Sequence, residues 1–325
     1  MKAIIQEKYG SPEVLQLKEV EKPIPGDDEV LVKVHAASVN SWDWDRLTGK
    51  PRLYRLLSGV MKPKLAILGA DVAGKVEAVG QNVKRFKPGD EVFGDLCEGN
   101  WGAFAEYVSA PEDALILKPS VMSYEEAAAV PQAGVMALQS IRDKGMVKQG
   151  QKVLINGAGG GVGTFAVQLA RLYGAEVTGV DSAAKLEMLR SIGAQHVIDY
   201  TKENFTKNGI SYDLIVDVVA NRSIFDYRRA LNRGGIFVMV GGTPTAIMQV
   251  ALLGPLISMF GSEKLGILVQ KPNKDLEYLT ELIQSGKVKP VIDRRYPLSQ
   301  APEALQRIGE GRVLGKVIIT LTESS

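Results

Sequence analysis

Residues 152–163 read Lys-Val-Leu-Ile-Asn-Gly-Ala-Gly-Gly-Gly-Val-Gly, and this stretch decides the fold. The apolar run Lys152–Asn156 predicts a short buried strand, and Thr164–Tyr173 predicts a helix directly after the glycines. Small residues allow a tight turn and let the backbone approach a pyrophosphate, while the helix start offers unpaired N–H groups. Measured against the pattern G-x-G-x-x-G, the turn carries Ala158 in place of the first glycine. The stretch predicts a dinucleotide-binding turn, and a glycine-rich loop without a ligand is the alternative.

The same alternation of strand and helix continues on the C-terminal side of this turn. A helix is predicted at Lys185–Ile192, and apolar strands are predicted at Glu176–Val180, His196–Ile198, Leu214–Val218 and Ile236–Val240. Strands that alternate with helices are typical of a parallel, doubly wound sheet. The sequence therefore predicts an α/β domain in this part of the chain.

Asp181 directly follows the predicted strand Glu176–Val180, about 20 residues beyond the turn. In dinucleotide-binding folds an acidic side chain at this position binds the adenosine ribose 2′-hydroxyl. A carboxylate there repels a 2′-phosphate and favours NADH. Lys185, four residues later, is a candidate phosphate ligand and keeps NADPH open, and Ser182 is a further candidate for binding the cofactor. The alternative is that Asp181 or Ser182 only caps the helix that follows.

The first 120 or so residues are predicted to be rich in β-structure. Valines alternate with other residues at Val30–Val34, and further strands are expected at Gly74–Val79, Glu91–Phe93 and Phe104–Val108. Ser123 and Glu126 have the spacing of a capping box at the start of a helix. After about Lys271 a helix at Asp275–Ser285 and a strand at Lys316–Leu321 are expected to return to this first domain. The predicted division is residues 1–124 with 268–325, and residues 125–267.

Length and composition limit the function classes. The 325 residues suggest about two domains, at roughly 150 residues per domain. Thirty-nine basic and 37 acidic residues give a formal charge of +2, so no nucleic-acid partner is expected. One cysteine and two histidines exclude an internal disulfide and a cysteine-cluster zinc site. No targeting segment or membrane span is predicted, so the expected location is cytoplasmic.

Several short motifs occur in a consistent order along the chain. They are Ala37-Ser-Val-Asn-Ser-Trp-Asp-Trp44, Gly69-Ala-Asp-Val-Ala-Gly74, Phe86-Lys-Pro-Gly-Asp-Glu-Val92, Gly102-Ala-Phe-Ala-Glu-Tyr107 and Ala129-Val-Pro131 with Ala133-Gly134. With these motifs, essentially the whole chain resembles the medium-chain dehydrogenase/reductase superfamily, and most closely its zinc-free quinone oxidoreductase branch. The resemblance implies a GroES-like, β-rich catalytic domain and a Rossmann domain.

The resemblance also bears on metal content. Members that use catalytic zinc hold it through Cys, His and Cys, and Asn40, Ala70 and Ala133 stand at those three positions here. Alanine offers no ligand atom and asparagine is a poor zinc ligand. A zinc-independent protein is therefore predicted, without zinc to polarise an alcohol.

The resemblance implies NAD(P)H-dependent reduction of a quinone or an α,β-unsaturated carbonyl without flavin, on a small lipophilic substrate. Such acceptors spread the incoming charge onto oxygen and need hydrogen-bond donors there more than a metal. Two alternatives stay open. One is an NAD(P)-dependent aldehyde or alcohol oxidoreductase, and the other is a cofactor-binding redox sensor or structural protein with little turnover.

The catalytic candidates are few. Asn40 is a candidate donor to a substrate oxygen or to the nicotinamide ribose, or it only closes a turn. Asp43 matches the pattern of the branch, or it caps a turn. Some relatives carry a tyrosine shortly after the asparagine, but Asp45 fills that position, and Tyr54 is a candidate substitute.

The remaining candidates concern the cofactor. Those predicted to form the glycine-rich turn are Gly157, Ala158, Gly159, Gly160, Gly161, Val162 and Gly163. Those predicted to line the nicotinamide are Ala133, Gly134, Met136, Gly241 and Gly242. Those predicted on the adenosine side are Tyr200, Val218, Val219 and Ala220. For Tyr200 ordinary packing is the alternative. Lys316 is predicted to reach the cofactor cleft, and a solvated lysine at a strand edge is its alternative.

The segment Thr245–Phe260 is apolar almost all round, and Gly254-Pro255 interrupts it. A helix without a polar face has to be covered on most sides. The segment is predicted to cover an apolar substrate pocket or to pack on a second subunit, with a homodimer as the expected assembly.

Overall fold

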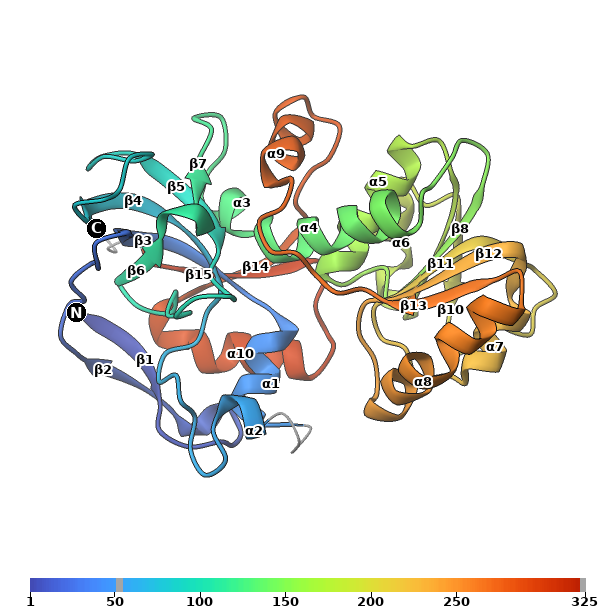
Figure 1. The fold of residues 1–325 in the computed structure, drawn as a ribbon, viewed down its shortest axis with the longest axis horizontal. Coiled ribbons are helices and arrows are strands. Elements are labelled where there is room, and N and C mark those ends of the chain that lie inside the picture. The colour runs from blue at the N-terminus through green and yellow to red at the C-terminus, as the bar shows by residue number, and fades with distance from the viewer. Residues whose placement is uncertain (51–54, 322–325) are drawn as a thin grey trace. The chain divides into compact units, whose positions relative to one another are not determined.

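The computed structural model describes residues 1–50 and 55–321, which form two compact units (Figure 1). The first unit comprises Met1–Ala133, Pro272–Gln284 and Pro290–Ser325, and the second comprises Gly134–Lys271 and Ser285–Lys289. The limits at Ala133/Gly134 and Lys271/Pro272 lie nine and four residues beyond the predicted division at 124/125 and 267/268, which stays a prediction. The first unit is thus built from both ends of the chain.

The first unit contains a seven-stranded sheet with the order β14-β15-β3-β4-β5-β7, in which β6 also pairs with β3. The long strand β3 is its centre. Val30, Val32 and Val34 are buried and Lys33 is exposed, as the alternation predicts, whereas Leu31 is buried as well. A separate two-stranded sheet pairs β1 with β2. The strands are β1 (Lys2–Gln6), β2 (Leu15–Glu19), β3 (Glu29–Val39), β4 (Asp71–Val79), β5 (Glu91–Asp95), β6 (Tyr107–Pro111), β7 (Ile116–Leu117), β14 (Ile292–Pro297) and β15 (Lys316–Thr320).

Short helices connect and cover these strands. Ser123 and Glu126 form the predicted capping box, because the Ser123 hydroxyl accepts the Glu126 N–H and the Glu126 carboxylate accepts the Ser123 N–H. The expected helix at Asp275–Ser285 is present. The helices of this unit are α1 (Ser41–Thr48), α2 (Arg55–Ser58), α3 (Tyr124–Ala128), α9 (Leu276–Gln284) and α10 (Ala301–Gly309).

The second unit is built on a six-stranded sheet in which every neighbouring pair is parallel. The strands are β8 (Lys152–Asn156), β9 (Glu176–Asp181), β10 (His196–Asp199), β11 (Tyr212–Asp217), β12 (Leu231–Met239) and β13 (Lys264–Ile267). Their order is β10-β9-β8-β11-β12-β13, so with β8 as the first strand it is 3-2-1-4-5-6. This is the order of the Rossmann fold, and the predicted doubly wound α/β sheet is confirmed.

Helices lie on both faces of this sheet. Figure 1 shows α5 and α6 over one face, and α7 and α8 against the other. A buried apolar cluster joins the second pair of helices to the strands and includes Tyr227, Phe237 and Val250. The helices are α4 (Pro131–Leu138), which contains the boundary between the units, α5 (Gly161–Leu172), α6 (Leu186–Ser191), α7 (Ile224–Arg229) and α8 (Pro244–Phe260).

Two predicted elements differ from the structure. The strand expected at Phe104–Val108 is wrong in position, because the strand β6 begins only at Tyr107. Phe104 instead donates its N–H to Leu68 and accepts one from Ile4, so its backbone joins other segments.

The helix α8 runs unbroken through Gly254 and Pro255. A Cβ at Gly254 would lie 2.7 Å from the Leu265 carbonyl oxygen, so this glycine marks a close approach of the helix to β13 and not a break.

Candidate active site

The glycine-rich turn lies between β8 and the start of α5. Gly157 has a φ of +76°, a left-handed conformation that suits glycine, and its N–H donates to the Val180 carbonyl at the end of β9. A Cβ on Gly163 would lie 2.3 Å from the Gly157 carbonyl oxygen, so only glycine lets the helix pack this close. The N-cap residue of α5 is Gly160, which has no side chain to accept an N–H of the first helical turn. The first-turn N–H groups are thus open to a phosphate, which fits a dinucleotide.

Asp181 contacts this turn directly. Its Oδ2 accepts the Gly159 N–H at 2.8 Å, and its Oδ1 accepts the Ser182 N–H at 2.8 Å. The Lys185 ammonium lies 3.2 Å from Oδ1, and both residues are buried. The structure therefore brings together Asp181, Ser182 and Lys185, the polar cofactor candidates at this strand end, and it adds the link to Gly159. The carboxylate is already hydrogen-bonded, and Lys185 offsets its charge.

Tyr200 lies beside Asp181 as well. Its backbone N–H donates to the Asp181 carbonyl at 3.2 Å, and 55% of the residue is exposed. An exposed ring at this position is available to stack against a base or a ribose. Ordinary packing does not describe a tyrosine that is so open.

The ends of β8 and β11 meet where the strand order of the parallel sheet reverses. Asn156 Nδ2 donates to Asp217 Oδ1 at 2.9 Å, and the same oxygen accepts the Val219 N–H at 2.9 Å. Burial raises the pKa of Asp217 to about 6, against the opposing effect of its hydrogen bond with Asn156. Ligands of open α/β sheets bind at such a switch point. Asn156 and Asp217 shape it, and sequence reasoning missed both.

The predicted adenosine and nicotinamide segments flank this point. Ala220 donates its N–H to Gly241 at 2.9 Å and forms an isolated parallel bridge with Gly242. A Cβ on Gly242 would lie 2.5 Å from the Ala220 carbonyl oxygen. Val219 is 52% exposed, whereas Ala220 is buried. The two segments are therefore adjacent at the carboxyl ends of β11 and β12.

In the first unit, the predicted residues Asn40 and Lys316 are in contact. The Lys316 ammonium donates to Asn40 Oδ1 at 2.5 Å. Lys316 is only 2% exposed, so the alternative of a solvated lysine at a strand edge is wrong. Asn40 is 7% exposed, and its Nδ2 donates to Asp71 Oδ2 at 3.0 Å.

Asp71 is the centre of this cluster and was not predicted as a site residue. Its carboxylate accepts the Ser38 hydroxyl at 2.6 Å, the Asn40 amide and the Gln132 N–H at 3.0 Å, and it lies 3.4 Å from the Lys316 ammonium. The one sequence signal was an acidic residue directly before the apolar strand residues Val72 and Ala73. Four donor groups therefore surround one buried carboxylate.

Asp43 is fully buried, and two backbone amides occupy its carboxylate. Oδ2 accepts the Asn40 N–H at 2.8 Å and Oδ1 accepts the Gly69 N–H at 2.9 Å. Burial raises the pKa of Asp43 to about 7. Burial also raises the pKa of the neighbouring Asp45 to about 6. Asp43 thus has the geometry of the capping alternative and fixes the backbone of Asn40.

The other predicted residues are placed as follows. Ala133 and Met136 lie in α4 and are buried, and Gly134 lies between them in the same helix. Tyr54 lies outside the described residues. Within residues 1–50 and 55–321, no group of three or more His, Cys, Asp and Glu side chains is arranged to hold a metal. The buried methyl groups of Ala70 and Ala133 do not fit a zinc ligand set.

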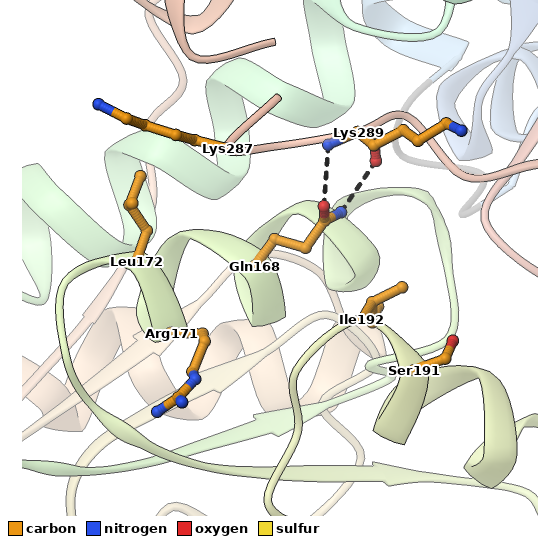
Figure 2. A pocket seen from close by; sticks show the side chains of 7 residues that line it. All are labelled: Gln168, Arg171, Leu172, Ser191, Ile192, Lys287 and Lys289. Atoms are coloured by element: carbon orange, nitrogen blue, oxygen red, sulfur yellow. Dashed lines mark hydrogen bonds between the residues drawn. The ribbon is translucent and has the colours of Figure 1, made fainter. Parts of the chain in front are cut away.

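A cavity of about 400 Å³ lies elsewhere in the second unit (Figure 2). Gln168 forms two hydrogen bonds with the backbone of Lys289 at its edge, and the Arg171 and Lys287 side chains extend away from each other. Arg171 and Leu172 lie at the C-terminal end of α5, whereas the glycine-rich turn precedes its N-terminus. This cavity is therefore not part of the candidate cofactor site.

Family models match both parts of the chain. A model described as an alcohol dehydrogenase GroES-like domain matches residues 26–120, and one described as a zinc-binding dehydrogenase matches residues 192–319. Of the helices in the described part of the chain, none has the length and apolar character needed to cross a bilayer.

Named proteins match nearly the whole chain. The 2-methylene-furan-3-one reductase of Solanum lycopersicum is 36% identical over 330 residues, which cover 98% of this chain and 79% of that protein. The chloroplastic NADPH-dependent alkenal/one oxidoreductase of Arabidopsis thaliana is 32% identical over 338 residues, covering 98% and 79%. The solved structure of the quinone oxidoreductase from Coxiella burnetii superposes with a TM-score of 0.88 at 30% identity, covering 99% of both chains.

Proposed function

The chain belongs to the medium-chain dehydrogenase/reductase superfamily, in its quinone oxidoreductase-like branch, and from that premise we propose how its residues carry out NAD(P)H-dependent hydride transfer to a quinone or an α,β-unsaturated carbonyl. The observation that carries the proposal is the turn Gly157–Gly163, which begins α5 at the switch point of a parallel sheet. The names of relatives agree on the acceptor. They name a quinone, an alkenal/one and a 2-methylene-furan-3-one, whose methylene group is conjugated with the ketone.

The residues of the turn and of the neighbouring strand ends are proposed to hold the cofactor. The first-turn N–H groups of α5 would bind the pyrophosphate, with the adenosine ribose near Asp181 and Tyr200. When bound, NAD(P)H would supply a hydride to the β-carbon of an enone or to a quinone. The electron pair of the reduced bond would move to the acceptor oxygen, and a proton from solvent would complete the two-electron reduction.

Asn40 is proposed as the residue that binds the acceptor oxygen. Its amide is nearly buried and held from both sides, by Lys316 and by Asp71. A fixed donor in a site with little water stabilises the negative charge that develops on the oxygen without having to reorganise. Asp43 is proposed as a positioning residue, because it holds the backbone N–H of Asn40.

We propose that the reaction needs no zinc. The support is the donor set, since Ala70 and Ala133 carry no ligand atom and Asn40 Oδ1 already accepts from Lys316. The matched description of a zinc-binding dehydrogenase concerns the family as a whole. Elemental analysis of the purified protein tests this, and about one tightly bound zinc per chain would contradict it.

We propose that both NADH and NADPH bind. Asp181 alone favours NADH, but Lys185 lies 3.2 Å from its carboxylate and offsets the negative charge that would repel a 2′-phosphate. A relative named for NADPH supports use of the phosphorylated cofactor as well. The earlier expectation of a leaning to NADH is thus weakened by the position of Lys185.

A homodimer is proposed from the surface of α8. Large apolar side chains are exposed along this helix, namely Ile247, Met248, Leu252, Leu256, Met259 and Phe260. Light scattering tests the proposal, and a monomeric mass at micromolar concentration would contradict it. The compartment also stays a prediction: the sequence favours the cytoplasm, whereas several relatives are named chloroplastic or mitochondrial. Fractionation against a cytosolic marker tests it.

The experiment that tests the function follows NADH and NADPH oxidation with quinones, enones, aldehydes and alcohols. The proposal expects oxidation with quinones or enones and little with simple aldehydes. Activity confined to aldehydes or alcohols would favour the alternative oxidoreductase. Tight cofactor binding without turnover on any acceptor would favour a sensor or structural protein.

A further inference from the structure

Asn40, Asp71 and Lys316 form one hydrogen-bonded cluster at the ends of three inner strands of the seven-stranded sheet. Asn40 follows β3, Asp71 begins β4 and Lys316 begins β15, and these strands are neighbours in the order β15-β3-β4. The register of β3 and β4 pairs Ser38 with Asp71. Three strands distant in sequence therefore deliver one amide, one carboxylate and one ammonium to the same place.

The chemistry of the two partners fixes the orientation of the Asn40 amide. Lysine has only donors, so the atom 2.5 Å from Lys316 Nζ has to be the oxygen Oδ1. The ionised Asp71 has only acceptors, so the atom 3.0 Å from its Oδ2 has to be the nitrogen Nδ2. Both contacts require the same orientation of the amide. If the amide were turned over, its oxygen would face the Asp71 carboxylate and its nitrogen would face the Lys316 ammonium.

The cluster is costly as a purely structural feature. Lys316 is 2% exposed and Asp71 is fully buried, and the loss of hydration of two buried charges often exceeds their mutual attraction. The ammonium and the carboxylate are also 3.4 Å apart, while the shorter contacts of both are made with Asn40 and Ser38. The charges therefore act on the amide between them at least as much as on each other.

We propose that Lys316 and Asp71 are positioning residues that hold the Asn40 amide in one orientation, so that Asn40 offers a bound ligand an N–H and never its carbonyl oxygen. Nδ2 carries two hydrogens, and Asp71 takes one of them. Among the described residues no acceptor takes the second, and this hydrogen is the one left for the ligand. The inference rests on the proposed function, in which Asn40 contacts the acceptor oxygen.

The consequence is a preference for the ligand group that faces Asn40. A quinone or enone presents a carbonyl oxygen, which accepts a hydrogen bond and becomes more negative as hydride arrives. A ligand that presents only an N–H donor would meet another donor. The Lys316–Asp71 pair is thus a specificity device for acceptor oxygens.

The variant Lys316→Met tests this by removing the donor that fixes Asn40 Oδ1. Without the ammonium the Asn40 amide can turn over and present its oxygen to the oxygen of the acceptor. We expect kcat/KM for a quinone or enone to fall at least about tenfold. Lys316→Arg keeps a charged donor at this position and should restore most of the lost kcat/KM, which a purely structural role would not require. The Kd of NADPH, measured by fluorescence, should change less than about twofold.

The double variant Lys316→Met with Asp71→Asn removes both charges of the cluster, so that neither is left buried without its partner. The inference expects a low kcat/KM per folded molecule in this variant as well, because the lysine donor that fixes Asn40 Oδ1 is still missing. A kcat/KM like that of the parent would contradict it.

A matched control removes another ion pair of the same unit. Arg307 and Asp293 form two hydrogen bonds at 2.6 and 3.0 Å, and neither contacts Asn40. Arg307→Met with Asp293→Asn should lower stability but leave kcat/KM per folded molecule and its pH profile unchanged. If Lys316→Met behaves like this control, the cluster is only structural and the inference is overturned.

The variant Asn40→Ala separates this inference from the proposed function. A parent-like kcat/KM with a quinone or enone would show that Asn40 does not contact the acceptor, and the proposed role would fail. A loss of kcat/KM in Asn40→Ala without a loss in Lys316→Met would leave that role intact and overturn only the positioning by Lys316 and Asp71.

Discussion

Replacing Lys185 by methionine tests how the site distinguishes its two cofactors. Methionine keeps most of the apolar side chain and removes the charge 3.2 Å from Asp181 Oδ1. If Lys185 binds the 2′-phosphate, one charge-assisted hydrogen bond of about 1.5–3 kcal/mol is lost, and the Kd of NADPH rises about 10- to 150-fold. The remaining Asp181 charge then repels the phosphate and adds to the loss. NADH has no such phosphate, so its Kd should change less than about threefold.

The assay is a fluorescence titration of parent and variant with both cofactors, from which the ratio of the two Kd values is taken. Lys148→Met is the control, because this lysine is exposed and lies outside the proposed site. A ratio that changes less than about threefold would refute phosphate binding by Lys185. Equal weakening of both cofactors would assign Lys185 to support of Asp181 and the turn.

Three further changes test the fold and the surface. Gly163→Ala places a Cβ 2.3 Å from the Gly157 carbonyl oxygen, so we expect a loss of about 1–3 kcal/mol in urea unfolding and weaker binding of both cofactors. Burial raises the pKa of Asp45 to about 6, so the folded chain keeps a proton there that the unfolded chain releases near pH 4. Asp45 should therefore lower the free energy of unfolding by about 2 kcal/mol as pH rises through this window, and Asp45→Asn should remove this contribution but not those of Asp43 and Asp217. Leu252→Ser with Leu256→Ser changes side chains that are 66% and 51% exposed, so unfolding should shift by less than about 0.5 kcal/mol per site while light scattering reports a loss of dimer or kinetics a higher KM for lipophilic acceptors.

The parallel sheet could be predicted because its strands are apolar runs with glycines and helices between them. β8 was predicted with its observed limits, and its glycine-rich turn placed the cofactor site. β13 was missed, since Lys264–Ile267 has four residues and contains Gly266, which weakens a strand signal. β14 was missed because Asp293, Arg294 and Arg295 break the apolar pattern.

The contacts of the candidate site also divide into those that local spacing in the sequence predicts and those that it does not. The contact of Asp181 with Lys185 joins residues four apart, and both were found from local spacing. The contacts of Asp71 reach 31 residues to Asn40 and 245 residues to Lys316, and they depend on strand pairing that no local pattern encodes. Burial also depends on residues that are distant in sequence. The sequence therefore allowed Lys316 either to reach the cofactor cleft or to lie solvated at a strand edge, and the structure excludes the second alternative.

The central claim is direct hydride transfer from a nicotinamide cofactor to a quinone or enone. The most direct test supplies NADPH and NADH carrying deuterium at the reactive C4 position, with an enone as acceptor, and locates the label in the product by mass spectrometry and NMR. The account predicts one deuterium on the β-carbon of the saturated product, with the rate unchanged after treatment with a zinc chelator. Product without deuterium, deuterium on the carbonyl carbon of an alcohol, or loss of activity with the chelator would contradict it.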